Sequence, residues 1–461
     1  MGQAMHNKPA GSPGRPEAES ADKAHLEPTT PKVESGPVAA PSPKSAGARA
    51  RFRLGDVLGG AAATGVALPQ SMALGVALFT GLGFDAAAGA LAGLIGAAIL
   101  SLVSGLRGAT IGMISAPNGP VVMLLTSGMA AVVAEGVTGD GLLLALAVIL
   151  ALTGIFQFLL GVSGGGQLIK FLPYPAVAGI VTSVGLSMVL SQITPLSGAD
   201  AQSLGRAWIA FPGAVAVATF VAIKLMPRVL PAIPGIVSGL LVGIGLFHLG
   251  LLLAPGAGPD SWLVGRIPTI GTSTLHIDFA AFTSLPWRTI FVAAATLAVI
   301  ASVDCLLTAV VADEATGERH DARGELMAQG IGQLLTGILG GVGGGGTKGS
   351  TLVAIKTGGR RWAAVVAGLT FIMLIVFLGP VGTILPISAL SGVMIYVGVS
   401  LFEWHILHWL RNSHTRVDGV VALLVVATTI FYGLMDGVAV GVLGSIALLL
   451  RNLVRGPVIH E

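Results

Sequence analysis

The chain reads IFVAAATLAVIASVDCLLTAVV from Ile290 to Val311, and this apolar run decides the fold. It is long enough for an α-helix that crosses a bilayer, which needs about 20 apolar residues. Asp304 is its only formally charged residue, and a carboxylate at that depth is costly and indicates a function. Asp304 and Thr308 are four positions apart, so a helix places both side chains on one face. A carboxylate and a hydroxyl together suit a small hard cation or a proton, and we hypothesise that Asp304 is the coupling site of an ion-coupled transporter.

The composition of the whole chain agrees with a membrane protein. Of its 461 residues, 53% are hydrophobic and only 10% are charged, against roughly a quarter charged in soluble domains. The 67 glycines follow no collagen-like period and suit close helix packing and broken helices. The single cysteine, Cys305, excludes a disulfide within the chain and a cysteine-based metal cluster. We therefore expect no transition-metal site, no resident cofactor and no nucleic-acid partner.

Residues 1–48 are rich in Pro, Ser, Ala, Glu and Lys, which predicts a disordered tail. From residue 54 onward we predict an all-α integral membrane protein with about fourteen transmembrane segments. The predicted spans lie at residues 57–79, 84–105, 117–135, 139–162, 173–194, 207–226, 232–254, 287–312, 325–341, 348–357, 361–384, 386–403, 416–433 and 436–454. The third and the tenth are short, and each follows a Gly-rich approach that is not helical.

The placement of charge gives the orientation of these spans. When the sides of the membrane alternate from span to span, Lys and Arg gather on one side, which is the rule for cytoplasmic loops. That side carries Arg49, Arg51, Arg53, Arg107, Lys170, Lys224, Arg228, Arg319, Arg323, Lys356, Arg360, Arg361, Arg411, Arg416, Arg451 and Arg455. The bias predicts an even number of spans, a multi-pass protein of the cell membrane, and both termini in the cytoplasm.

Two similar segments predict an internal repeat. Residues 172–179 (LPYPAVAG) and 184–187 (VGLS) match residues 385–392 (LPISALSG) and 397–400 (VGVS) in order and spacing. They open the fifth and twelfth spans, which run in opposite directions. This pattern indicates an inverted repeat of seven plus seven spans, with a first repeat at about 54–254 and a second at about 287–455. Chance similarity of apolar segments is the alternative.

The two short spans occupy matching positions of these halves, and such broken helices indicate the binding site of a transporter. Their approaches read GMISAPNGP over residues 112–120 and GGGGTKGST over residues 343–351. Each half-helix would begin near the middle of the membrane and offer free N–H groups with about half a positive charge. We expect an anion site at Ser115, Asn118, Gly119, Lys348, Gly349 and Ser350. The alternative is that these glycines only permit close packing.

Several segments together resemble the SulP family of anion transporters. They are LPQSMA at residues 68–73, SAPNGP at 115–120, ELMAQG at 325–330 and GGR at 358–360. The resemblance covers about residues 54 to 455. It implies the family fold, with a core domain of spans 1–4 and 8–11, a gate domain of spans 5–7 and 12–14, and elevator-type movement of the core. Gln70 in the first segment is a candidate for lining the site, with a helix–helix hydrogen bond as the equal alternative.

Within the family, the sodium-dependent bicarbonate transporters match best. Their eighth span is similar to SVDCLLT at residues 302–308, followed by VAD at 311–313. This resemblance implies that Asp304 and Thr308 bind sodium and that Gly346 and Thr347 contribute to the same centre. Sodium would then be a co-transported ion.

Two features depart from the family pattern. Only residues 455–461 follow the last span, so we expect no soluble STAS domain. The resemblance also implies a homodimer, but the missing STAS domain weakens this expectation. Lys348 stands where the sodium-dependent branch is expected to have an uncharged residue. It could be the counter-charge of the anion, or it could reach Asp304 and replace the cation as a fixed ammonium.

These patterns favour secondary active transport of a small inorganic anion, bicarbonate or sulfate, across the lipid bilayer. Sodium symport by an elevator-type mechanism is the leading expectation. A proton-coupled symporter or an exchanger of sulfate, chloride or dicarboxylates is the alternative, and an anion channel is a weaker one. No nucleophile–His–acid group or metal-ligand set lies within the spans, so we do not expect an enzyme.

Overall fold

The structure is a computed structural model that describes residues 52–165, 174–197, 206–231, 233–253, 260–268, 279–377, 379–412 and 415–433, with a few positions between 436 and 444. Its helices are α1 (Leu54–Gly81), α2 (Ala86–Arg107), α3 (Gly119–Ala134), α4 (Asp140–Val162), α5 (Tyr174–Leu190), α6 (Ile193–Leu196), α7 (Arg206–Val229), α8 (Gly235–Leu253), α9 (Trp287–Thr316), α10 (Ala322–Ile338), α11 (Lys348–Lys356), α12 (Ala363–Phe377), α13 (Ile387–Ser400), α14 (His405–Arg411) and α15 (Arg416–Tyr432). Two short strands, β1 (Ser115–Ala116) and β2 (Gly345–Gly346), complete the described regular structure, apart from short 3-10 segments.

The predicted spans agree with these helices. A described helix stands at each predicted span up to residue 433. The last predicted span, 436–454, falls mostly outside the described residues, as do the tail at 1–48, residues 455–461 and the first two residues of the repeat at 172–179. By length and composition, eight of the described helices could cross a membrane, and α3 and α12 are shorter apolar helices. The all-α membrane fold is therefore as predicted, with broken third and tenth spans.

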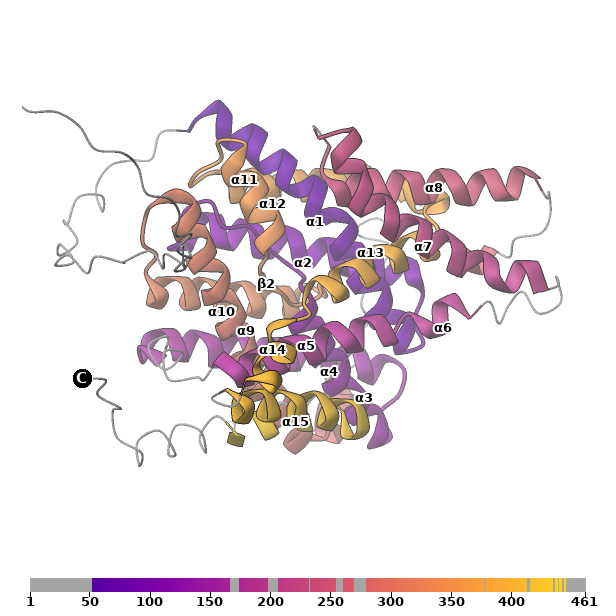
Figure 1. Cartoon of the computed structure of the whole chain (residues 1–461). Helices are drawn as coiled ribbons and strands as arrows, with labels where there is room; N and C mark the ends of the chain where they lie inside the picture. The colour runs from indigo at the N-terminus through magenta and orange to yellow at the C-terminus, as the bar shows by residue number, and fades with distance from the viewer. Residues whose placement is uncertain are drawn as a thin grey trace, which may run out of the picture. The chain divides into compact units, whose positions relative to one another are not determined.

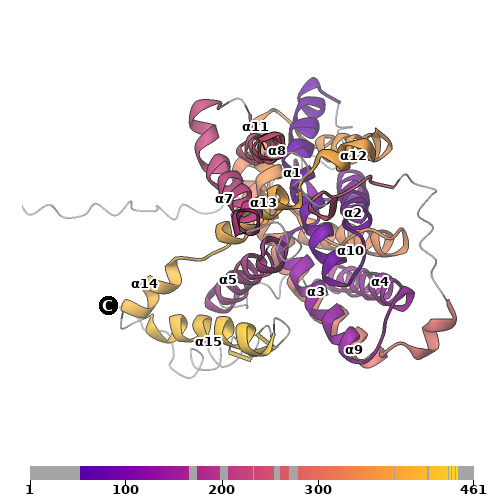
Figure 2. The same ribbon diagram turned by 90° about the vertical axis from the view of Figure 1, so that its right-hand side faces the viewer.

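The helices form two groups (Figures 1 and 2). The first group holds α1–α4 and α9–α12, and the second holds α5, α7, α8 and α13–α15; each helix packs mainly on members of its own group. In Figure 2, α15 lies beside α5 and α7 beside α8, whereas α9 lies beside α3. The main contacts between the groups are α1 with α13 and α3 with α5. These groups correspond to the predicted core and gate.

Helix packing follows the predicted inverted repeat. α4 packs on α10 as α12 packs on α2, and α3 packs on α9 as α11 packs on α1. In the second group, α7 packs on α13 as α15 packs on α5. In each comparison, every helix of the first contact is replaced in the second contact by the helix seven spans away in the other half. Two inverted halves require this exchange.

The repeated motif itself lies at one of these contacts. Gly185 of α5 and Gly398 of α13 hold the same place in the two matching segments. They face each other, and a Cβ added to Gly398 would come within 2.7 Å of the Gly185 carbonyl oxygen. Small residues permit such close backbone approach between membrane helices. The sequence repeat therefore marks the crossing of α5 and α13.

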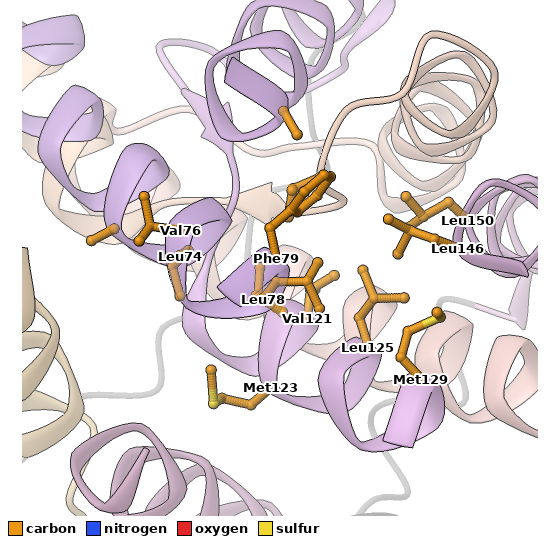
Figure 3. Close-up of a cluster of buried hydrophobic side chains, with 14 of the residues drawn as sticks. Leu74, Val76, Leu78, Phe79, Val121, Met123, Leu125, Met129, Leu146 and Leu150 are labelled. Carbon is orange, nitrogen blue, oxygen red and sulfur yellow. The ribbon is translucent and has the colours of Figure 1, made fainter. Parts of the chain in front are cut away.

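The interior of the first helix group is apolar and close-packed (Figure 3). Leu78 and Phe79 of α1 lie beside Val121 of α3, while Leu146 and Leu150 of α4 lie on the other side of the cluster. All five side chains are buried. Between membrane helices this packing, rather than transfer from water, supplies the attraction. It fixes the first turn of α3, and with it the loop that precedes the helix.

Candidate ion and anion site

Both broken helices begin inside the first helix group. Asn118 is the N-cap of α3, and Thr347 is the N-cap of α11. Pro120 lies in the first turn of α3, where its missing N–H costs nothing. The strands that precede the helices, β1 and β2, pair antiparallel with Ser115 opposite Gly346. The two half-helices therefore start from one shared strand pair, at equivalent positions of the two halves.

Oxygen atoms of α9 and β2 meet at the end of this strand pair. The Thr308 hydroxyl donates to the Gly346 carbonyl and to the Asp304 carbonyl, each at 3.1 Å. The Asn118 amide nitrogen donates to Asp304 Oδ2 at 2.7 Å and lies 3.5 Å from the Gly346 carbonyl oxygen. Thr308 and Asn118 are buried, and Asp304 is partly exposed. A carboxylate, a carbonyl and a hydroxyl are the ligand types that hard cations prefer.

Side chains from α10 and α11 hold the strand pair in place. Gln333 donates to the Gly344 carbonyl at 2.5 Å and accepts from the Gly344 N–H at 3.3 Å. Thr351 accepts from the Ile114 N–H at 3.0 Å, and the Thr347 N–H donates to the Ile114 carbonyl at 2.8 Å. The Thr347 hydroxyl donates to the same carbonyl at 3.0 Å. In this conformation Thr347, predicted as part of the cation centre, therefore secures the start of β1, and no hydrogen bond joins it to Asp304 among the described residues.

Ser115, predicted as an anion contact, is also engaged elsewhere. Its hydroxyl is fully buried and accepts from Gln329 at 2.6 Å, and its carbonyl accepts from Ser101 at 2.7 Å. Gln329 also donates to Glu325 at 3.0 Å. Glu325 is fully buried and accepts from the N–H groups of Ala109 and Thr110 at 2.8 and 2.9 Å. A chain of hydrogen bonds thus runs from the loop after α2 to β1, and Ser115 is part of this support.

The remaining predicted anion contacts lie around the two helix starts. Lys348 and Gly349 are exposed in the first turn of α11, and Ser350 is buried. Among the described residues, no ion pair within 4.0 Å joins the Lys348 ammonium to the Asp304 carboxylate. The alternative that Lys348 replaces the cation in direct contact with Asp304 is therefore not realised in this conformation.

The start of α3 faces the second helix group. A Cβ added to the buried Gly119 would lie 2.6 Å from the Met188 sulfur of α5 and 3.2 Å from Leu401, which follows α13. Gln70 of α1 is half-buried and donates to the Pro117 carbonyl at 3.5 Å. Gln70 therefore does contact the approach to α3, as a weak hydrogen bond between segments.

Two cavities adjoin this region. A cavity of about 630 Å³ lies between the helix groups on the side predicted to be extracellular. Polar uncharged and apolar side chains line it, mainly from α1, α3, α6 and α13, and none of its described lining residues is charged. It extends to Ala73, about one turn of α1 from Gln70. A smaller recess reaches Asp304 and is lined by Pro120, Val177, Ile180, Val181, Ile300, Val303 and Leu307.

Sequence reasoning did not assign the residues that support the site. Glu325 and Gln329 stand four apart in the segment ELMAQG, so their shared helix face could have been read from the sequence. Gln333 continues the same face by one more turn. Met188, by contrast, lies among ordinary apolar residues of α5, and nothing in its sequence context singles it out.

Comparison with known proteins places the chain among anion transporters. Residues 54–427 match the model of the sulfate permease family. The chain is 29% identical over 413 residues to the bicarbonate transporter BicA of Picosynechococcus sp., covering 84% of this chain and 68% of that transporter. It is 30% identical over 372 residues to the putative sulfate transporter YbaR of Bacillus subtilis, covering 79% and 72%.

Solved structures show the same fold. The transmembrane domain of a cyanobacterial bicarbonate transporter BicA superposes with a TM-score of 0.68 at 26% identity, over 87% of this chain and 97% of that one. The murine anion transporter Slc26a9 in its inward-facing state superposes with a TM-score of 0.69 at 18% identity, over 87% and 69%. The latter supports the fold alone.

Proposed function

The chain belongs to the sulfate permease family, and we propose from this premise that it carries a small inorganic anion, bicarbonate or sulfate, across a membrane in symport with sodium. Relatives named as bicarbonate transporters and as a putative sulfate transporter support the anion class. They are transporters and not enzymes, in agreement with the sequence. Choosing between the two anions needs experiment, because helix ends recognise charge and size more than chemical identity.

The observation that carries the sodium proposal is the cluster at the end of the strand pair. Asp304 supplies a carboxylate, Gly346 supplies a carbonyl, and Thr308 supplies a hydroxyl. A hydrogen bond joins the Thr308 hydroxyl to the Gly346 carbonyl. A carboxylate without a contacting cation is costly inside a membrane. Within the described residues Asp304 has no ion-pair partner, so a bound sodium ion would neutralise it. We assign sodium to these three residues as cargo.

The anion would bind between the two helix starts. The start of each helix offers backbone N–H groups that have no partner within the helix. The residues around these groups are Asn118 and Gly119 at α3, and Gly349 and Ser350 at α11. Lys348 adds a full positive charge at this point. Sodium beside Asp304 would remove the negative charge that otherwise repels an anion. Each ligand then raises the affinity for the other by the same factor.

An elevator-type movement fits the two helix groups. The site is built almost wholly from the first group, so it could move as one body past the second. Met188 of α5 and Leu401 close over Gly119 at the boundary between the groups. The cavity on the predicted extracellular side would admit the anion once these side chains withdraw.

We also place the protein in the cell membrane with both termini cytoplasmic, on the strength of the Lys and Arg bias in the sequence. A homodimer is supported by the family relationship only. Cross-linking in membranes tests it.

A variant of Asp304 tests the proposed function. Asp304→Asn removes the charge and keeps the shape, and we expect sodium-dependent uptake of bicarbonate or sulfate to disappear. The matched control is Asp313→Asn on the same helix. Asp313 lies away from the site and pairs with His320 at a distance of 2.7 Å. The control should retain uptake. Sodium-dependent uptake that survives Asp304→Asn would refute the assignment, and uptake driven by a proton gradient would favour the proton-coupled alternative.

A further inference from the structure

Asn118 contacts the cation cluster and the start of α3 through the two ends of one side-chain amide. Its oxygen accepts from the Val121 N–H at 3.3 Å and so caps α3. Its nitrogen donates to Asp304 Oδ2 at 2.7 Å and lies 3.5 Å from the Gly346 carbonyl. The side chain is 5% exposed, so water does not compete strongly for these bonds.

The neighbours of this amide determine its orientation. The Val121 N–H can only donate, so it needs the amide oxygen. The Asp304 carboxylate, when ionised, can only accept, so it needs the amide nitrogen. Because oxygen and nitrogen sit on the same planar carbon, a rotation that breaks one bond also breaks the other. The state of Asp304 and the state of the helix cap are therefore linked through a single torsion.

The amide nitrogen also occupies the place of a cation. It touches the Asp304 carboxylate and the Gly346 carbonyl, which are two of the three oxygens assigned to sodium. The N–H groups are the positive end of the amide dipole and would repel a sodium ion bound there. At the other end, the amide oxygen covers an N–H of α3 that an anion would use. As it stands, Asn118 obstructs both ligands.

We propose that the Asn118 amide is the coupling element of the transporter and that it turns by about half a rotation when sodium and the anion bind. The proposal rests on the proposed sodium–anion symport. In the turned state the amide oxygen faces Asp304 and Gly346 as a further sodium ligand. The amide nitrogen then faces the start of α3 and donates to the anion, together with the Val121 N–H.

This arrangement makes binding cooperative. With no ligand, the turned amide sets its oxygen against the Asp304 carboxylate and its N–H groups against the Val121 N–H. Sodium removes the first repulsion, and the anion removes the second. Either ligand alone therefore meets an opposing cost that both together do not, and the coupling needs no large movement of the helices.

The test uses variants that keep the cap but remove the second end of the amide. Serine is as good an N-cap as asparagine, yet its hydroxyl is too short to cap Val121 and reach Asp304 together. Asn118→Ser is the main variant, and Asn118→Asp is a second one that keeps the size and the cap without any N–H donor. Asn412→Ser, at the exposed end of α14, is the matched control.

The measurement is the melting temperature of the purified full chain against sodium chloride, with choline chloride holding ionic strength constant, with and without sulfate or bicarbonate. The ratio of the two apparent sodium dissociation constants is the coupling factor. We expect about 5–150-fold in the wild type and in Asn412→Ser, a ratio near one in Asn118→Ser, and tighter sodium binding in Asn118→Ser than in the wild type when no anion is present. In Asn118→Asp, the fixed negative charge should bring the ratio to one or below.

The outcomes separate this inference from the proposed function. A wild type whose melting temperature ignores sodium contradicts sodium coupling itself, and the inference falls with it. A wild type that shows coupling, together with an Asn118→Ser or Asn118→Asp variant that retains the same ratio, overturns the role of Asn118 alone.

Discussion

Replacing Gly346 with alanine adds only one methyl group, but it should weaken sodium binding strongly. A Cβ at this position would lie 2.9 Å from the Met113 sulfur and 3.0 Å from two carbon atoms of Thr308. Unstrained carbon contacts are near 3.5–4.0 Å, so β2 must move by about half an ångström. That displacement carries the Gly346 carbonyl away from Thr308, whereas cation ligands tolerate about 0.2 Å. Overpacking of this kind costs about 1–3 kcal/mol.

If that cost falls on the bound state, the sodium dissociation constant rises about 5- to 150-fold, since 1.4 kcal/mol is a factor of ten. The assay is the sodium dependence of the melting temperature and of uptake into proteoliposomes. Gly245→Ala is the control, because a Cβ at this α8 position meets nothing within 4 Å. A Gly346→Ala protein that responds to sodium like the control would refute the assignment of this carbonyl as a ligand.

Three further substitutions test the surroundings of the site. Thr308→Val keeps the shape but leaves the Gly346 carbonyl without its 3.1 Å donor. Sodium affinity should then fall about 5- to 150-fold, for a loss of about 1–3 kcal/mol, and Thr308→Ser should largely restore it in the same titration. Glu325→Gln can still accept from the Ala109 and Thr110 N–H groups through its amide oxygen, but its NH2 then faces the Gln329 NH2 donor. We expect about 1–3 kcal/mol of lost stability, seen as a lower melting temperature. Gly398→Ala forces α5 and α13 apart and should lower the melting temperature with little change in the apparent sodium dissociation constant.

The local sequence was sufficient to predict the broken helices. Pro120 after a short polar approach, and the four glycines before Thr347, set the starts of α3 and α11 within about two residues. The same was true of the inverted repeat, because Gly185 and Gly398 are needed where two backbones meet. Such signals lie in the chain near the feature that they predict.

The contacts within the site could not be predicted in the same way. Ser115 pairs with Gly346 across more than two hundred residues, and no local pattern gives that register. Asn118 was assigned to the anion, yet its nitrogen contacts Asp304, because the sequence does not say which end of an amide faces which neighbour. Ser115 and Thr347 have hydroxyls of the expected type, but in this conformation the Ser115 hydroxyl accepts from Gln329 and the Thr347 hydroxyl donates to the Ile114 carbonyl. Residue type predicted the chemistry available, and tertiary packing decided its use.

The central claim is that an anion crosses the membrane together with sodium. The most direct measurement is uptake of labelled bicarbonate and of labelled sulfate into proteoliposomes of the wild type, with and without an inward sodium gradient at fixed pH. We expect one of these anions to accumulate only when the sodium gradient is present. Uptake that is the same with and without sodium would contradict the claim and would assign Asp304 to a proton, or the chain to an exchanger.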